Sequence, residues 1–85
     1  MKKYRLNKGF ITQKVGSKTT VFSGEDSILY TFNNTASFIF NGLKLGWEKS
    51  KIIQGLVEKY GVKRTTAASD IEDFIKQLKT KKILS

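Results

Sequence analysis

The chain contains no cysteine, no histidine and no proline. Without cysteine the chain cannot form disulfides. Without cysteine and histidine, the usual zinc sites and Cys/His catalytic sites are excluded as well. Its serines and threonines have no histidine that could act as a base. We therefore expect a protein that is not an enzyme and has no metal or cofactor. The absence of proline favours regular elements that are joined by glycine turns.

Long apolar runs are also missing. No stretch approaches the roughly 20 apolar residues of a membrane-spanning helix. The N-terminal segment MKKYRLNKGF is basic, but no apolar segment follows it, so we expect no secretory signal. These features lead us to expect a cytoplasmic protein. The length of 85 residues predicts a single domain, residues 1–85.

Acidic residues are scarce, and they do not form a predicted metal site. Glu25 and Asp26 lie in the sequence GED, which is typical of a turn. Asp70 and Glu72 are two residues apart and do not share one face of a helix. We expect the acidic residues at 70, 72 and 73 to stabilise the N-terminal half of a helix whose second half carries lysines. No glycine-rich phosphate-binding motif occurs.

Basic residues, in contrast, are abundant. The chain has 16 lysines and arginines and 7 acidic residues, for a net charge of +9. The lysines are spread along the chain and most of them stand singly. Two interpretations remain open at this point, a solvated basic surface and attraction to an acidic partner.

Three β-prone runs occupy the first part of the chain, namely 10–15 (FITQKV), 18–22 (KTTVF) and 27–32 (SILYTF). Gly16 and Ser17 predict a tight hairpin between the first two runs, and SGED predicts the next turn. In the third run alternate residues face opposite sides: Ile28, Tyr30 and Phe32 on one face, Leu29 and Thr31 on the other. The YRL sequence near the start is a candidate for a further extended piece.

After the third run the apolar period changes from two residues to 3.6. The first predicted helix begins after an N-cap at Asn33 or Asn34 and buries one face, made of Ala36, Ile39, Phe40 and Leu43. The second helix covers about residues 48–60 and ends at Gly61. Its apolar residues are Ile52, Ile53, Leu56 and Val57.

A third helix is predicted near the C-terminus, with Thr65 or Thr66 as its N-cap. Its apolar stripe consists of Ile71, Phe74, Ile75 and Leu78. Trp47, between the first two helices, is expected to cover the core. Three strands followed by three helices predict an α+β fold of the winged helix-turn-helix type, in which a three-stranded antiparallel sheet is covered by helices on one face.

A helix-turn-helix arrangement raises the alternative of a basic nucleic-acid-binding protein. A recognition helix usually presents its N-terminal residues to the base edges beside the phosphates. The third predicted helix carries the acidic sequence SDIED in its first half, which would repel phosphates. Nucleic-acid binding would then depend on the C-terminal lysines and on Lys14 and Lys18, so we regard it as the second interpretation.

Three segments carry a resemblance to a known family. The sequence YTFNNTASFIF resembles a hydrophobic-x-Leu-Asn-x-Thr-Ala-x-x-Ile-Trp signature, KIIQGLVEKYGV is similar to a middle helix, and DIEDFIKQLKTKKIL is similar to a closing Asp-Val-x-x-Phe-Leu helix. These are motifs of the PqqD (pyrroloquinoline quinone biosynthesis protein D) family, and the resemblance covers about residues 10–84. Phe32 stands where leucine is usual, Phe40 where tryptophan is common, and Lys82 where the family has glycine.

The resemblance implies a recognition domain for ribosomally synthesised precursor peptides. Such a domain binds the leader segment of the precursor and presents it to a modifying enzyme, such as a radical S-adenosylmethionine enzyme, or to a leader peptidase. In the family the leader is added as a strand beside the third strand and lies against the third helix. An unpaired sheet edge offers the N–H and C=O groups that this mode needs.

Carried over onto this sequence, the resemblance implies ten site residues. The strand that receives the leader is Ile28, Leu29, Tyr30, Thr31 and Phe32, and the facing wall is Asp70, Ile71, Phe74, Ile75 and Lys76. For Phe32 and Leu78 we expect a role in the core instead of contact with the peptide. Basic residues near the site would suit an acidic leader. The same free edge leaves open a homo-oligomer in which it pairs with a second copy.

Overall fold

The computed structural model describes residues 4–84, which form three strands and three helices. The elements are β1 (Phe10–Val15), β2 (Lys18–Ser23), β3 (Ile28–Phe32), α1 (Asn34–Leu45), α2 (Lys49–Tyr60) and α3 (Arg64–Thr80). The strands pair antiparallel in the order β1-β2-β3. The predicted order of three antiparallel strands and three helices is therefore confirmed.

The sheet follows the predicted turns closely. Gly16 adopts a left-handed φ of 63° in the tight turn between β1 and β2, a conformation that glycine accepts without strain. The second turn ends one residue later than predicted, because Ser27 has a φ of 54° and β3 begins only at Ile28. The register places Phe22 opposite Ile11 on one side and opposite Leu29 on the other.

The first two helices begin and end where the local signals indicate. Asn33 is the N-cap of α1, and its side-chain oxygen accepts a hydrogen bond of 2.9 Å from the N–H of Ala36. Gly61 ends α2 in the left-handed conformation, with a φ of 66°. Trp47 is half-buried and packs against the core, as expected. An alanine Cβ at Gly42 would lie 2.8 Å from its ring.

The beginning of α3 differs from the prediction. The N-cap is Lys63 and the helix starts at Arg64, so Thr65 and Thr66 lie inside its first turn. The earlier start brings Ala67 into the core, where it is fully buried. The residue at the cap has extended backbone, but its side chain makes no capping hydrogen bond. The packing of Ala67 in the core therefore outweighs the intrinsic preference of threonine for the N-cap position at this helix boundary.

The expected helix-dipole role of the acidic residues in α3 is also wrong. Because the helix starts at Arg64, no acidic residue lies in its first turn, and the dipole acts mainly there. Glu72 instead forms an ion pair with Lys49 at the start of α2. The hydrogen bond from Lys49 lowers the pKa of Glu72, and the same hydrogen bond raises the pKa of Lys49.

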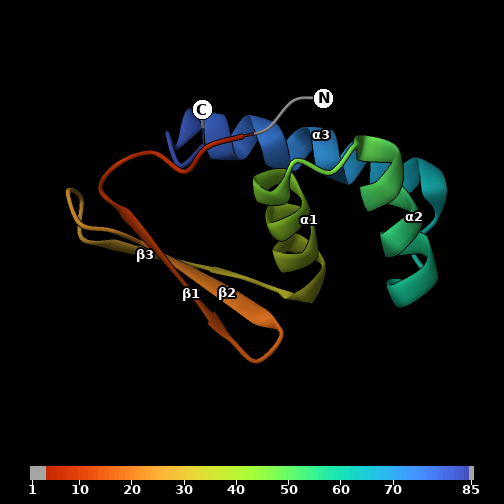
Figure 1. The fold of residues 1–85 in the computed structure, drawn as a ribbon, viewed down its shortest axis with the longest axis horizontal. Coiled ribbons are helices and arrows are strands. Elements are labelled where there is room, and N and C mark those ends of the chain that lie inside the picture. The colour runs from red at the N-terminus through yellow and green to blue at the C-terminus, as the bar shows by residue number, and fades with distance from the viewer. Residues whose placement is uncertain (1–3, 85) are drawn as a thin grey trace.

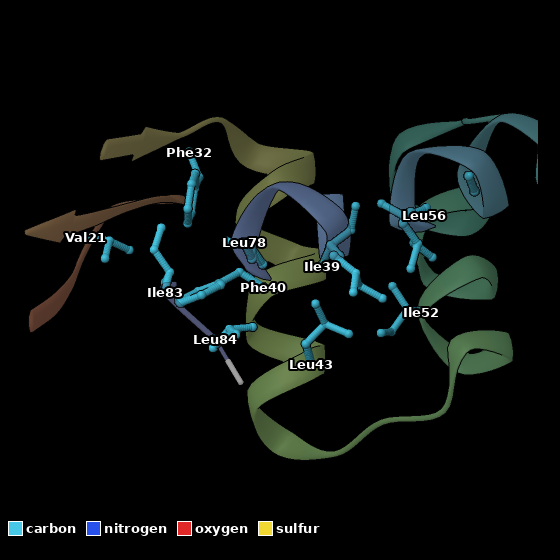
Figure 2. Close-up of a cluster of buried hydrophobic side chains, with 13 residues drawn as sticks. Val21, Phe32, Ile39, Phe40, Leu43, Ile52, Leu56, Leu78, Ile83 and Leu84 are labelled. Atoms are coloured by element: carbon cyan, nitrogen blue, oxygen red, sulfur yellow. The ribbon is translucent and has the colours of Figure 1, made fainter. Parts of the chain in front are cut away.

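Figure 1 shows the sheet on one side of α1 and α2 on the other, while α3 runs along one end of both helices. The core fills the space between these elements. Figure 2 shows Val21 of the sheet and Ile83 near Phe40 of α1, and it shows Ile39 and Leu43 facing Ile52 and Leu56 of α2. Each of these side chains is almost fully inaccessible to solvent.

The two ends of the described chain meet. Leu6 and Leu84 form an isolated antiparallel bridge, and the N–H of Asn7 donates a 2.9 Å hydrogen bond to the carbonyl of Ile83. The extended piece expected at YRL is thus a single bridge residue. Among residues 4–84 no helix has the length and hydrophobicity to cross a bilayer.

Candidate functional site

The sheet has two edges, and β3 is the edge that lies beside a helix. Only the β2 side of β3 is paired in the described chain, so alternate residues direct their N–H and C=O groups away from the sheet. The rings of Phe32 and Phe74 of α3 meet edge to face, with centroids 5.1 Å apart. The Nζ atom of Lys81 lies 5.0 Å from the ring centroid of Tyr30. These contacts place an unpaired strand edge next to a helix.

The other edge is formed by β1 and differs in its surroundings. Lys44 of α1 contacts β1 through a hydrogen bond of 3.5 Å to the hydroxyl of Thr12. Among residues 4–84, no aromatic pair joins β1 to a helix, whereas the pair of Phe32 and Phe74 joins β3 to α3. Of the two edges, β3 is therefore the one that an aromatic pair joins to α3.

A hollow of about 270 Å³ lies just past the C-terminal end of β3, where the start of α1 meets α3. Its lining residues are Asn33, Thr35, Ala36, Ile39, Asp70, Asp73, Phe74 and Gln77. We call the edge of β3, this hollow and Lys81 the β3–α3 site. Phe74 joins its parts, because it lines the hollow and also contacts Phe32.

The five predicted strand residues occupy β3 as expected, but they face two sides. Tyr30 and Phe32 point toward the helices, and Phe32 is buried, which confirms its expected place in the core. Ile28 shares their side of the strand and is 44% exposed. Leu29 is 61% exposed and Thr31 is also exposed, both on the solvent face of the sheet. The five residues therefore share one free backbone edge, whereas their side chains do not share one surface.

Three of the five predicted wall residues of α3 do not offer side chains to the hollow. Ile71 and Ile75 are 1% and 7% exposed, so they lie in the core instead of on the expected wall. Lys76 does not line the hollow, and its charge acts on Glu72 on another side of the helix. Asp70 and Phe74 do line it.

Sequence reasoning missed several members of the β3–α3 site, above all Asp73, Gln77 and Lys81. A signal for the first two was present in the helical period. Asp70, Asp73, Phe74 and Gln77 stand at i, i+3, i+4 and i+7, so they share one face of α3. This face adjoins the apolar stripe, and its orientation toward the sheet edge depends on packing that spacing alone does not reveal.

The charges at the site differ from the expected basic surroundings. The hollow carries two carboxylates, Asp70 and Asp73, and no lysine or arginine. The cation at the site is Lys81, above Tyr30. The site is thus acidic in the hollow and basic toward the C-terminal end of α3. No group of three or more acidic residues among residues 4–84 has the arrangement of a metal site.

The first turn of α3 bears on the nucleic-acid interpretation. Lys63 and Arg64 stand at its N-terminus, so the expected repulsion of phosphates by the start of this helix is wrong. This basic start by itself is not a binding surface, and none of the comparisons that follow supports binding of nucleic acid.

Comparison with known structures returns the same fold. The chain of a structure described as lasso peptide synthetase B1 complexed with the leader peptide superposes with a TM-score of 0.88. It is 24% identical, and the match covers 99% of this chain and 99% of that chain. A structure described as TbiB1 in complex with the TbiA(beta) leader peptide has a TM-score of 0.81 at 18% identity, covering 95% of this chain and 94% of that chain.

Comparison with curated proteins finds no match. The family model of coenzyme PQQ synthesis protein D matches residues 19–84, which include β2, β3 and all three helices. The match covers most of the chain and includes every element of the β3–α3 site. The chain therefore belongs to the coenzyme PQQ synthesis protein D (PqqD) family.

Proposed function

We propose that this protein binds the leader segment of a ribosomally synthesised precursor peptide and presents it to a modifying enzyme. The observation that carries the proposal is the unpaired edge of β3 beside α3. The family membership supports it, as do the two structural neighbours, which are described as complexes with leader peptides. A further support is that Asp70 and Phe74, two of the expected wall residues, line a hollow at the C-terminal end of this strand.

Binding would occur by addition of the leader as a fourth strand. The outward N–H and C=O groups of β3 would pair with the peptide backbone, which supplies affinity with little dependence on sequence. Alternate side chains of the peptide would turn toward α3, where Phe74 and the half-buried Tyr30 offer apolar surface. These side chains would supply specificity. The remaining side chains would lie on the solvent face, beside Leu29.

The proposed role is that of a binding domain without catalysis of its own. The modifying enzyme, such as a radical S-adenosylmethionine enzyme, or a leader peptidase would carry out the chemistry on the presented precursor. We place this protein and its partner enzyme in the cytoplasm, where ribosomes make the precursor.

Proline substitutions in β3 test strand addition directly. Along an edge strand one of two neighbouring residues directs its N–H away from the sheet, and the other donates to the neighbouring strand. Tyr30→Pro and Thr31→Pro are compared, and one of the two removes an outward N–H. That variant should stay folded but bind the leader about tenfold or more weakly, because one backbone hydrogen bond to the peptide is lost and the edge is distorted. The other variant should mainly destabilise the sheet.

The measurement is a titration with a synthetic peptide that has the leader sequence of a candidate precursor, followed by backbone amide shifts. Gln13→Pro and Lys14→Pro are the matched controls on the β1 edge, and the folded member of that pair should keep its affinity. Thermal unfolding identifies the folded variants. If the folded β3 variant binds the leader as tightly as the wild type, or if the shifts avoid residues 28–32 and α3, strand addition at β3 is wrong.

A further inference from the structure

A second hollow lies on the opposite side of α1 from the β3–α3 site. It measures about 380 Å³ and is lined by residues from the end of β1, the β1–β2 turn, α1, the segment between α1 and α2, and the end of α2. Figure 1 shows this turn and the adjoining ends of both helices on one side of the molecule. Along α1, the residues that line it (Asn34, Ser37, Phe38, Asn41) and those that line the first hollow (Thr35, Ala36, Ile39) fall on opposite helical faces. We call it the α1–α2 pocket.

Aromatic rings form the apolar part of the pocket. The position of one of them, Phe38, requires that Gly55 has no side chain. The ring of Phe38 lies against the backbone of α2, where an alanine Cβ at Gly55 would be 2.3 Å from the ring. Phe38 contacts Trp47 at 5.6 Å and Tyr60 at 5.9 Å between ring centroids, both edge to face. The three rings are thus held in place before any ligand arrives, which lowers the cost of ordering on binding.

The polar part of the pocket is cationic and rich in donors. Lys14 and Lys59 line it, and no acidic residue does. Neither lysine lies within ion-pair distance of a carboxylate in the described chain. The Nζ atom of Lys59 lies 5.3 Å from the centroid of the Phe38 ring.

Two asparagines add neutral donors to the pocket. The side-chain oxygen of Asn34 accepts a 2.7 Å hydrogen bond from the hydroxyl of Ser17, which leaves both of its N–H groups without a protein acceptor in the described chain. Asn41 makes no side-chain hydrogen bond among residues 4–84. Ammonium and amide donors that converge beside aromatic rings match a carboxylate attached to an apolar body.

We infer that the α1–α2 pocket is a docking site for an acidic segment of a partner protein, in which a glutamate or aspartate stands next to an aromatic or aliphatic residue. Charge complementarity selects this occupant, because the pocket is cationic and the whole chain carries +9, which disfavours a second copy of itself. Nucleic acid fits less well, since backbone tracking needs a row of cations along a groove. Since the two sites lie on opposite faces of α1, occupation of one leaves the other accessible.

The test uses a short acidic probe, acetyl-EEFEE-amide, with acetyl-QQFQQ-amide as its uncharged match. Titrated into isotope-labelled protein, the acidic probe should shift the backbone amides of Ser17, Asn34 and Asn41 and the indole N–H of Trp47. The effect should weaken with salt and be absent with the uncharged probe. This readout does not involve the leader peptide, so its result is independent of the proposed function.

Charge-reversal variants locate the site. The double variant K14E/K59E should weaken binding of the acidic probe by about tenfold or more, because two attractions become repulsions. The matched control K8E/K76E makes the same change in net charge at residues that do not line the pocket, and it should alter the affinity by less than about twofold. If the double variant fails to fold, Asn41→Asp replaces it in the test. This substitution keeps the size of the side chain and should also weaken binding of the acidic probe.

Three outcomes would overturn the inference. Equal losses in K14E/K59E and K8E/K76E would mean that the probe responds to net charge alone. Shifts confined to α3 or to β3 would assign the probe to the other site. Tighter binding of a 12-base-pair DNA duplex, with shifts in the same pocket residues, would make the pocket a nucleic-acid site instead.

Discussion

Lys82 adopts a left-handed backbone conformation, with a φ of 61°. It follows the last turn of α3 in a Schellman motif, because the N–H of Ile83 donates to the carbonyl of Leu78 at 2.9 Å and the N–H of Lys82 donates to that of Lys79 at 3.0 Å. Glycine normally occupies this position, since it has no Cβ to clash there. The lysine found where the PqqD family has glycine therefore carries backbone strain.

Replacing this residue by glycine should stabilise the protein. Lys82→Gly removes a strain of about 1–2 kcal/mol but adds about 0.4–1 kcal/mol of flexibility to the unfolded chain, so we expect a net gain of about 1 kcal/mol in the free energy of unfolding. Urea denaturation measures it. Lys82→Ala keeps a Cβ and should show no comparable gain. Equal effects of glycine and alanine would show that the lost lysine side chain, and not the backbone, is responsible.

At the scale of the element, α2 and α3 are joined by an exposed ion pair. Lys49 is the first residue of α2, where a cation is disfavoured by the positive end of the helix dipole. Glu72 of α3 supplies the compensating charge. Both side chains are more than half exposed, so salt screens the pair and its contribution is small at high ionic strength.

The ion pair should make the stability depend on pH. The pKa of Glu72 is lowered in the folded protein, chiefly by the hydrogen bond from Lys49. Its contribution is therefore present above the ordinary value of 4.5 and is lost as the pH falls through the lower folded pKa. Glu72→Gln should be less stable than the wild type at pH 7 in low salt, and this difference should shrink on acidification. At the alkaline end the raised pKa of Lys49 means that the pair is lost only above its ordinary value of 10.5.

Urea denaturation of both proteins at pH 7 and at pH 3 gives the comparison. Repeating the pH 7 experiment in 1 M salt, where the screening length is about 3 Å, provides the control, and the difference should largely vanish. A difference that persists unchanged in acid and in salt would assign the effect to the shape of the side chain and not to its charge.

Two residues that follow α3, Ile83 and Leu84, complete the core of the molecule. Ile83 is fully buried, and Leu84 pairs with Leu6 near the other end. Figure 2 shows Ile83 between the sheet and α1, close to Val21 and Phe40. The sheet and the helices therefore share their core with a segment that belongs to neither.

Truncation of this residue should be costly. Ile83→Ala should lower the free energy of unfolding by about 2–5 kcal/mol, because it leaves a cavity between the sheet and α1. Ile11→Ala makes the same chemical change at a side chain that is 66% exposed on the solvent face of β1, and should change stability by about 0.5 kcal/mol or less. Urea denaturation measures both. Similar losses in the two variants would mean that Ile83 does not close the core.

The elements and their order could be predicted from the amino-acid sequence, because the signals that specify them are local. The alternation in residues 28–32, the cap at Asn33 and the stop at Gly61 act through neighbouring atoms and were found where expected. The apolar stripe of α3 could be predicted as well, because its period is visible in the chain. The motifs that carried the family resemblance lie in these same elements. The match to the PqqD family model confirms the resemblance.

Which faces of these elements become sites depends instead on contacts between segments that are distant in the sequence. Packing moved the start of α3 to Arg64, buried Ile71 and Ile75, and turned Asp73 and Gln77 toward the hollow beside β3. Helical spacing shows which residues share a face, but contacts between distant segments choose where that face is directed. The α1–α2 pocket is the clearest case, because its rings and lysines come from β1, the two helices and the segment between them, and no local pattern specifies that these parts meet.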